Sequence, residues 1–176
     1  LESIEAPLVP TYIFYDKVSA TKWANTTTFP KVFKLRGGAG ATNVKLIKTK
    51  KEALKKINKA FGKGFSKFDR FAHVKDRYTK MKSGDATSLD LLKASGRLLF
   101  PTKFSKILGR EKGYVYFQDF IPQNDSDTRV IVIGERAFAI KRMTRKGDFR
   151  ASGSGNIKYE KKSIDERCVK LAFDIN

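Results

Sequence analysis

The sequence is poor in residues that many metal and redox sites require. It contains one cysteine, Cys168, and one histidine, His73. A single cysteine excludes a disulfide within the chain, so we expect a reducing, cytoplasmic setting. A lone histidine with no cysteine near it in the sequence excludes a histidine–cysteine zinc site.

The chain also lacks long apolar runs and is short of acidic residues. No run approaches the roughly 20 apolar residues of a membrane-spanning helix, so no membrane association is expected. Thirty-seven lysines and arginines against 18 aspartates and glutamates give a net charge of +19. This excess predicts attraction to polyanions such as nucleotides, nucleic acid, acidic peptides or anionic lipid, without choosing among them.

The composition that is present describes a chain with a packed core. Of 176 residues, 40% are hydrophobic and 14 are phenylalanine, which excludes a disordered chain. This length is sufficient for one domain or two small lobes. A hairpin, mixed helices, a strand, a second hairpin and a final helix follow one another, which predicts an α+β chain in two small lobes.

A glycine-rich hairpin is the most distinctive stretch of the sequence. Apolar runs at 32–35 and 44–47 indicate two strands, and 36–43 between them holds three glycines. Glycine allows backbone N–H groups to approach an anion closely. Lys34 lies on the strand that enters the loop. We therefore consider a loop that covers nucleotide phosphates, and an ordinary hairpin tip is the alternative. No Gly-Lys-Ser/Thr follows, so this is not a P-loop.

Two capping boxes mark helix starts. Thr49 and Glu52 open one helix, and Ser163 and Glu166 predict the start of the last. A second hairpin is predicted from strands 128–133 and 137–143, because glycine stands at the tight turn between them.

Aromatic and basic residues are interleaved between 65 and 78. Phe65, Phe68 and Phe71 alternate with arginine and lysine, and such a pattern can stack bases and contact phosphates. Phenylalanines at helical spacing also form ordinary core stripes. A core stripe is the commoner reason for phenylalanines at this spacing, and a nucleic-acid-binding role stays open.

Several motifs occur in an order that resembles one family. They are Phe-Pro-Lys-Val-Phe-Lys, the glycine-rich hairpin, Gln-Asp-Phe-Ile, Asp-x-Arg, and a hairpin followed by Lys-Arg and Asp-Phe-Arg-Ala-Ser. This order resembles the ATP-grasp superfamily, nearest to its ribosomal-protein-modifying, glutamate-ligase-like branch, over roughly residues 28–174. The resemblance implies an α+β, ATP-grasp-like fold in which each of two small lobes has an antiparallel sheet and helices. The N-terminal lobe would be residues 1–117. Residues 118–176 would be the inter-lobe strand and an incomplete C-terminal lobe.

The resemblance also implies roles for single residues. Arg129 and Arg150 would be catalytic, facing the phosphate or the acyl phosphate. Asp127 and Asn156 would contact the substrate. ATP-binding roles fall to Lys34, Gly37, Gly38, Ala39, Gly40, Ala41, Thr42, Gln118, Asp119, Phe120, Ile121, Lys141 and Arg142.

The implied activity is that of an ADP-forming, ATP-dependent ligase that joins a carboxylate to an amine or a thiol. Such enzymes phosphorylate the carboxylate and then let the nucleophile attack the acyl phosphate. Catalysis is mostly positioning and electrostatic stabilisation by lysine, arginine and Mg²⁺. ATP and Mg²⁺ are the implied cofactors, and the carboxylate substrate, for which an acidic molecule is one candidate, stays open.

One departure from the family pattern concerns the metal. The family's Mg²⁺ ligands are an acidic residue and a Glu-x-Asn pair on strands after the helix that is predicted near Ser163. The sequence ends at Asn176, so those ligands are expected outside this chain and none is assigned within it. We expect a fragment without the N-terminal pre-domain or the metal-binding strands, and with little metal-dependent activity by itself.

Two other functions stay open. A basic module for nucleic acid or another polyanion is favoured by the charge and by the interleaved aromatics. An ATP-grasp kinase would share the fold but transfer phosphate to an acceptor that is not a carboxylate. The ordered motifs favour the ligase.

Overall fold

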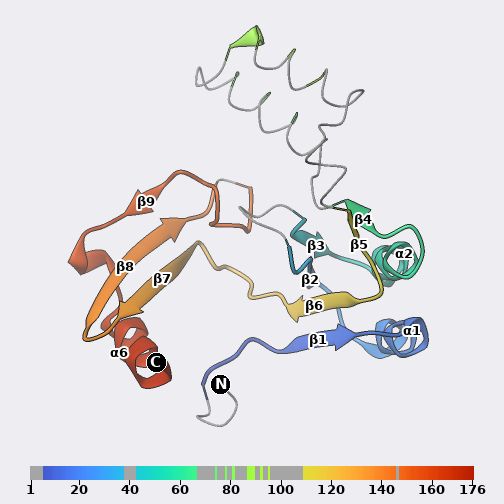
Figure 1. The fold of residues 1–176 in the computed structure, drawn as a ribbon, viewed down its shortest axis with the longest axis horizontal. Helices are drawn as coiled ribbons and strands as arrows, with labels where there is room; N and C mark the ends of the chain where they lie inside the picture. Colours follow the sequence, from blue (N-terminus) through green and yellow to red (C-terminus); the bar gives the residue numbers. More distant parts are fainter. Residues whose placement is uncertain are drawn as a thin grey trace. The chain divides into compact units, whose positions relative to one another are not determined.

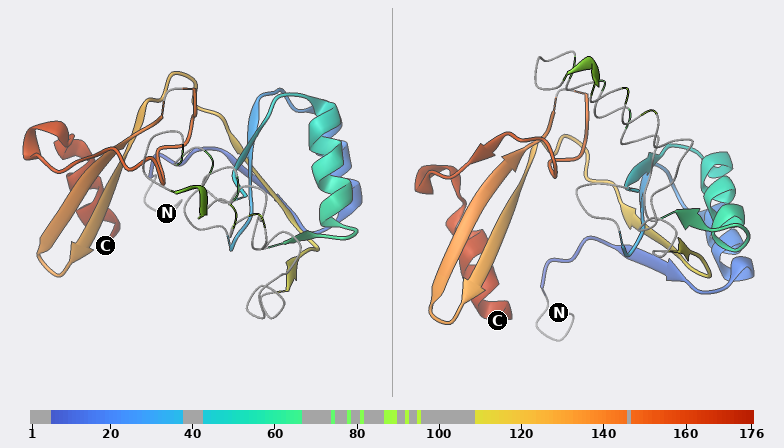
Figure 2. Two further views of the ribbon diagram at one scale, coloured as in Figure 1. Left: turned by 90° about the horizontal axis from the view of Figure 1, so that it is seen from above. Right: turned by 45° about the horizontal axis from the view of Figure 1, so that its top comes forward.

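The computed structural model describes residues 6–37, 43–66, 109–145 and 147–176, with 74, 78, 81, 87–89, 92 and 95. The chain divides into two compact units (Figures 1 and 2). One is Thr11–Gln118, and the other is Asp119–Asn176 with the segment that precedes Thr11. Both combine helices with small antiparallel sheets, which confirms the predicted α+β class.

The first unit is built on a four-stranded sheet in the order β1-β6-β2-β3. Thr11 pairs with Gln118 between β1 and β6, and Lys31 pairs with Ile47 between β2 and β3, both antiparallel. The second pair confirms the first predicted hairpin, whose residues 38–42 lie outside the described part. The strands are β1 (Thr11–Phe14), β6 (Val115–Asp119), β2 (Lys31–Lys34) and β3 (Lys45–Ile47).

Two helices pack side by side on one face of this sheet, α1 (Lys17–Thr26) and α2 (Lys50–Ala60) (Figure 2). Each begins at a side-chain cap. The Asp16 carboxylate accepts from the Ser19 N–H at 2.7 Å, and the Thr49 hydroxyl accepts from the Glu52 N–H at 3.3 Å. The predicted cap at Thr49 is confirmed, although the glutamate reaches back to the Lys48 N–H.

Aromatic rings fill the space between the helices and the sheet. The Trp23 ring centroid lies 4.8 Å from that of Phe117 and 5.0 Å from that of Tyr12. Phe33 contacts Phe117 and Phe65 at 5.5 and 5.1 Å. Rings at these separations add attraction to the burial of their apolar area, so this cluster is the main stabilising element of the unit.

A short strand pair, β4 (Phe65–Ser66) and β5 (Arg110–Glu111), lies at the end of α2. Gly64 leads into it with φ +68°, a conformation that L side chains rarely adopt. A Cβ at this position would lie 2.7 Å from the carbonyl oxygen of Glu111. Glycine is therefore required here both by backbone geometry and by the closeness of β5.

The second unit is a three-stranded antiparallel sheet in the order β7-β8-β9. Its strands are β7 (Ser126–Ile133), β8 (Arg136–Met143) and β9 (Ile157–Lys158). Ile133 pairs with Arg136 across a two-residue turn, and Gly134 there has φ +57°. A positive φ at the first position of a two-residue turn matches the twist of the strands, and this confirms the second predicted hairpin.

The last helix, α6 (Glu166–Ile175), contacts β7 and begins later than the sequence predicts. Asp165 is its N-cap, and the Asp165 carboxylate accepts from the Arg167 N–H at 2.9 Å. The prediction of Ser163 as the cap is wrong, because Ser163 ends a 3₁₀ turn, η2 (Lys161–Ser163). None of the helices in the described part of the chain is long and apolar enough to cross a membrane.

Candidate functional site

The sheet face of the first unit that points away from α1 and α2 carries a polar chain of contacts. Alternation along the strands places Lys34, Gln118 and Thr11 on this face. The Lys34 ammonium donates to the Gln118 side-chain oxygen, and the Gln118 amide nitrogen donates to the Thr11 hydroxyl at 3.2 Å. Three strands thus contribute to one hydrogen-bonded row, although Lys34 and Gln118 are 84 residues apart.

Lys34 is suited to an anionic ligand. Its ammonium lies 6.0 Å from the centre of the Tyr116 ring and is half-buried. Burial lowers its pKa below the usual 10.5, because a charged ammonium loses hydration there. An anion beside this ammonium would compensate for the lost hydration. Ile13, 48% exposed on the same face, supplies an apolar surface next to the polar row.

The residues at the start of the glycine-rich loop are held by the protein itself. The Arg36 N–H donates to the Tyr114 hydroxyl oxygen at 2.8 Å, and the Gly37 N–H donates to the Glu111 carboxylate at 2.9 Å. The Tyr114 hydroxyl in turn donates to the same carboxylate. Gly37 is therefore anchored, and its amide already has an acceptor. The other predicted loop residues lie outside the described part: Gly38, Ala39, Gly40, Ala41 and Thr42.

The predicted inter-lobe segment, residues 118–121, is shared between the two units. Gln118 ends the first unit, and Asp119 begins the second. The Asp119 N–H donates to the Pro10 carbonyl at 2.9 Å. Phe120 contacts the Phe149 ring edge-on at 6.0 Å between centroids, and Ile121 is 51% exposed. The strand β6 ends at Asp119, so Phe120 and Ile121 follow it.

The basic residues of the second hairpin separate onto two faces. Asp127 pairs with Arg142 across β7 and β8, whereas Lys141 pairs with Thr128. Successive side chains point to opposite faces of a sheet, so Arg142 and Lys141 cannot share a face. Arg129, two residues after Asp127, lies on the Asp127 side. The structure thus groups Asp127, Arg129 and Arg142 and separates Lys141 from them.

An ion pair distinguishes the two arginines of this face. The Arg142 guanidinium donates twice to the Asp127 carboxylate, at 2.7 and 2.8 Å. This fork geometry holds both groups firmly. Arg129 is exposed and has no ion-pair partner among the residues that the structure describes. Arg129 is consequently the cation of this face that is available to an external anion.

Lys141 on the opposite face lies close to the start of α6. The pKa of Asp165 is lowered to about 2, mainly by the hydrogen bond from the Arg167 side chain and least by the charge of Lys141. Along β7, Thr128 and Val130 are half-buried whereas Arg129 and Ile131 are exposed, and α6 contacts β7, so α6 covers the face that carries Thr128 and its partner Lys141. This placement separates Lys141 from the group of Asp127, Arg129 and Arg142.

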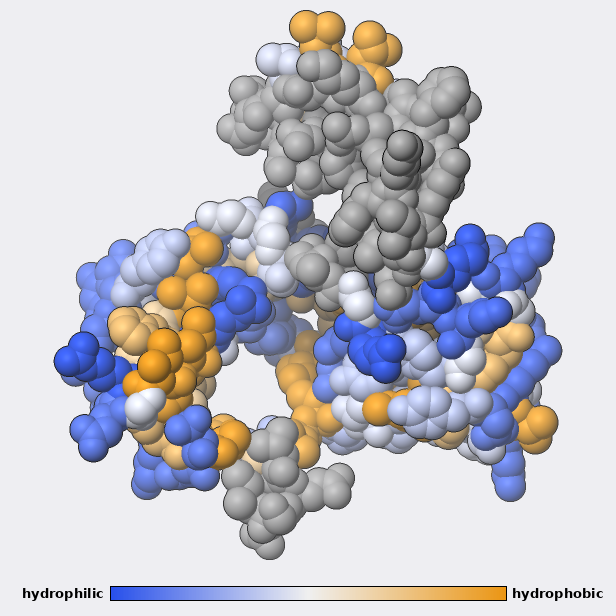
Figure 3. Space-filling view, viewed as in Figure 1, coloured by the Kyte–Doolittle hydropathy of each residue, from blue (hydrophilic) through white to orange (hydrophobic). Residues whose placement is uncertain are grey.

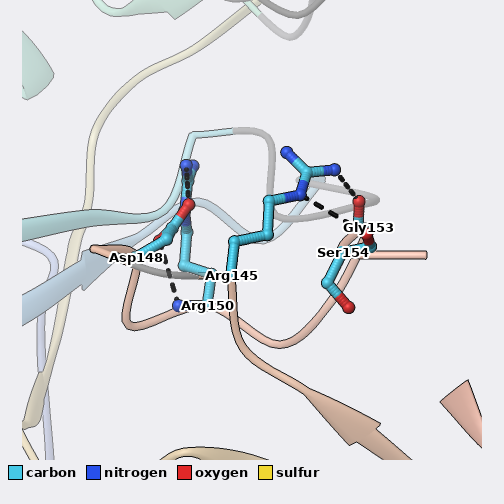
Figure 4. A network of polar contacts seen from close by, with 5 residues as sticks. All are labelled: Arg145, Asp148, Arg150, Gly153 and Ser154. Atoms are coloured by element: carbon cyan, nitrogen blue, oxygen red, sulfur yellow. Dashed lines mark hydrogen bonds and ion pairs between the residues drawn. The ribbon is translucent and has the colours of Figure 1, made fainter. Parts of the chain in front are cut away.

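The loop after β8 is organised by two arginines (Figure 4). The Arg150 guanidinium donates to the Asp148 carboxylate at 2.7 and 2.9 Å, and this contact lowers the pKa of Asp148 and raises that of Arg150. Arg145 donates to the carbonyl oxygens of Gly153 and Ser154. The predicted catalytic Arg150 is thus paired with a neighbour in its own loop.

Asn156 closes this loop. Its backbone carbonyl accepts from the Met143 N–H at 2.9 Å, and its N–H donates to the Ser154 hydroxyl at 3.2 Å. These contacts fix the backbone at Asn156, whose side chain is exposed.

The described residues do not fit a divalent metal. No group of three histidine, cysteine, aspartate or glutamate side chains that could hold an ion occurs in residues 6–37, 43–66, 109–145 or 147–176. The Asp127 carboxylate is paired with Arg142, and the Asp148 carboxylate is paired with Arg150. A Mg²⁺ site formed by Asp127 and Asp148 would require the ion pairs of these aspartates with Arg142 and Arg150 to open.

Comparison with known families decides the relationship. Residues 101–176 match the family model of the RimK-like ATP-grasp domain. This part of the chain is similar to RimK-like ATP-grasp domains. The predicted superfamily and branch are confirmed over this part, which contains Gln118, Arg129 and Arg150. Lys34 and the glycine-rich hairpin precede the matched region. No curated protein matches the chain. ATP-grasp domains bind ATP, usually with Mg²⁺, and the match supports an ATP-dependent, ligase-type function in general.

Sequence reasoning missed the residues that hold the base of the hairpin, Glu111 and Tyr114. A single acid in the stretch Arg-Glu-Lys resembles a solvated surface residue, and no periodicity marks it. Its 7% exposure is a property of the fold alone. Tyr114 gave a weak signal, since a tyrosine at the start of a buried strand commonly uses its hydroxyl as a polar handle.

Proposed function

We propose that this chain is the ATP-binding portion of a ligase that activates a carboxylate as an acyl phosphate and joins it to an amine or a thiol. The Lys34–Gln118 contact carries this proposal. It links the RimK-like part of the chain to the hairpin that precedes that part, and it places an ammonium on the sheet face that points away from α1 and α2. A phosphate-contacting lysine beside a side-chain amide is a suitable arrangement for a purine nucleotide.

The reaction needs no nucleophilic side chain from the protein. A carboxylate oxygen of the substrate attacks the γ-phosphorus of ATP, an O–P bond forms, and the bond to the β–γ bridging oxygen breaks to release ADP. An amine then attacks the acyl carbon, inorganic phosphate leaves, and the amine loses its proton to solvent. Negative charge is carried by phosphoryl oxygens in both steps, so cations determine the rate.

In this scheme two cations have separate tasks. Lys34 contacts the phosphate chain of ATP. Arg129, exposed and without an ion-pair partner in the described part, contacts the transferred phosphoryl group or the acyl phosphate. Arg142 holds Asp127 in place, and Arg150 shapes the loop that carries Asn156.

Calorimetric titration with ATP tests nucleotide binding. We expect Lys34→Met to weaken ATP binding about tenfold or more, since a hydrogen bond to a charged group contributes about 1.5–3 kcal/mol. Lys22→Met is the matched control, because Lys22 is an exposed lysine on α1 and makes no contact with the row. If Lys34→Met binds ATP as tightly as the wild type, Lys34 does not contact the nucleotide.

The pH dependence of binding gives a second readout on the same lysine. Because its pKa is lowered, Lys34 loses its charge at a pH below its usual 10.5. ATP binding by the wild type should therefore weaken as the pH rises through this lowered value. In Lys34→Met, ATP binding should not weaken in this way as the pH rises. If both proteins lose affinity over the same pH range, a group other than Lys34 causes the loss.

Isotope transfer separates a ligase from a kinase. With an ¹⁸O-labelled carboxylate substrate, a ligase delivers one labelled oxygen to inorganic phosphate, since the acyl C–O bond breaks when the amine attacks. A kinase leaves the phosphate on its product and releases none. A panel of carboxylic acids with ATP, an amine and Mg²⁺, assayed on the full-length protein, makes the measurement.

A second candidate function, polyanion binding, is favoured by the surface of α2. Lys51, Lys55 and Lys59 are exposed and spaced by four, so they form one basic stripe. Titration with a random RNA at several salt concentrations tests it. A steep salt slope without ATP binding would replace the ligase proposal with this one.

A further inference from the structure

Both ends of the glycine-rich loop are attached to the same short strand pair, β4–β5. The Gly37 N–H donates to Glu111 of β5, and the Asn43 side-chain amide donates to the Ser66 carbonyl of β4 at 3.3 Å. Gly37 is the last described residue before the loop, and Asn43 is the first described residue after it. The β4–β5 pair thus holds the base of the hairpin from both sides.

Glu111 is an unusual residue for this position. It is 7% exposed, and its carboxylate accepts hydrogen bonds from two neutral donors, the Gly37 N–H and the Tyr114 hydroxyl. Acidic residues are rarely buried unless hydrogen bonds compensate for their lost hydration. A buried carboxylate that accepts a backbone N–H gives a firm, charge-assisted contact. Its position is therefore coupled to the conformation of Gly37.

The strand pair itself is fixed to the end of α2. The Arg110 side chain donates to the carbonyls of Lys63 and Gly64, the latter at 2.8 Å. The Gly113 N–H donates to the Ala60 carbonyl at 3.0 Å. Glu111 lies between these two attachments, so its carboxylate presents a fixed acceptor to the hairpin.

We propose that Glu111 and Tyr114 are positioning residues that set the affinity for the phosphate end of the nucleotide. They fix the backbone of Arg36 and Gly37, and thereby the end of the strand that carries Lys34. This inference rests on the proposed ATP binding and goes beyond it, because neither side chain contacts the nucleotide. Gly37 anchors the hairpin in this scheme and contributes no amide to a phosphate.

The proposal predicts a selective effect. A displaced Arg36–Gly37 segment misplaces groups that contact phosphates, whereas the base and the ribose are contacted elsewhere. ATP binding should therefore depend on Glu111 and Tyr114, and adenosine binding should not. A residue that only holds the fold together would weaken both ligands equally, so the ratio of the two affinities isolates positioning.

The experiment compares Tyr114→Phe and Glu111→Gln with the wild type by titration with ATP and with adenosine. Tyr114→Phe removes only the hydroxyl, and Glu111→Gln removes the charge while leaving an acceptor for Gly37. We expect ATP affinity to fall about tenfold in Tyr114→Phe and by a smaller factor in Glu111→Gln, with adenosine affinity unchanged. Tyr159→Phe and Glu135→Gln, exposed residues of the second unit, are the matched controls.

Three other outcomes are informative. Unchanged ATP affinity in both variants would overturn the positioning role while leaving ATP binding in place. An equal loss for ATP and adenosine would overturn it in favour of a structural role, and fluorescence of Trp23 would then report an altered fold. Absence of ATP binding by the wild type would overturn the proposed function, and this inference with it.

Discussion

The two units of the chain differ sharply in how far their apolar residues are buried. In Thr11–Gln118, the side chains of Phe33, Ile57 and Phe117 are each at most 1% exposed. In Asp119–Asn176, Ala151 is the one buried apolar residue within the described part, and α6 has none. Apolar surface is visible on the second unit (Figure 3), and its exposed large apolar side chains include Ile121, Ile131, Ile133, Phe138, Phe173 and Ile175.

The difference teaches that regular secondary structure and a core are separable. The β7–β8 hairpin is longer than any strand pair of the first unit, yet α6 covers only one of its faces. Hydrogen bonds and turn chemistry are sufficient to specify a hairpin, whereas burial on both sides is needed for a core. The first unit should therefore account for most of the stability, and the following substitutions test this.

Phe117→Ala should have the largest effect. Phe117 is fully buried and contacts both Trp23 and Phe33, so truncation leaves a cavity at the centre of the cluster. We expect a loss of about 3–5 kcal/mol in the free energy of unfolding. Trp23 is the only tryptophan, so chemical denaturation followed by its fluorescence reports this unit. A loss below about 1 kcal/mol would contradict a close-packed core.

Gly64→Ala should have the next largest effect. The left-handed conformation costs a non-glycine residue about 1–2 kcal/mol, and the new Cβ would meet the Glu111 carbonyl at 2.7 Å. We expect destabilisation of about 2 kcal/mol or more, measured by denaturation. Gly134→Ala is the control, because it has a similar φ of +57° with no atom near the added Cβ. An equal loss at both positions would assign the whole effect to backbone strain.

Asp165→Asn should destabilise only the second unit, and its difference from the wild type should be present at neutral pH and disappear at low pH. The folded pKa of Asp165 is about 2, below its ordinary value of 3.8, because Arg167 stabilises the charged form. A depressed pKa adds stability that is complete above the unfolded pKa and is lost as the pH falls towards about 2. The wild type should therefore lose helix between these values by circular dichroism at 222 nm, and the variant should not. A matching change in Trp23 fluorescence would contradict the assignment to this unit.

Phe138→Ser should have the smallest effect on stability. Phe138 is 58% exposed on the open face of the hairpin, so its removal vacates little packed volume. We expect a change within about 0.5 kcal/mol, together with less self-association in sedimentation, since exposed apolar patches favour association. A loss comparable to that of Phe117→Ala would mean that the hairpin face is buried in solution.

The local sequence predicted much of the secondary structure for identifiable reasons. Thr49 and Glu52 form a cap because both groups are within one turn, and Gly134 makes the turn that its backbone permits. The same reasoning failed at the last helix, where Ser163 and Asp165 are both suitable N-cap residues. Asp165 caps α6, and Ser163 does not. Local chemistry thus identifies the helix but not the residue that begins it.

The candidate site shows the same division. The sequence by itself determined the residue types, the motif order and the approximate positions of the strands that carry them. Only the tertiary structure decided that Gln118 meets Lys34, that Lys141 and Arg142 lie on opposite faces, and that the Glu111 carboxylate accepts from the Gly37 N–H across 74 residues of chain. The reason is physical: period and propensity act over one or two turns of chain, whereas burial and pairing between distant residues depend on the packing of the whole unit.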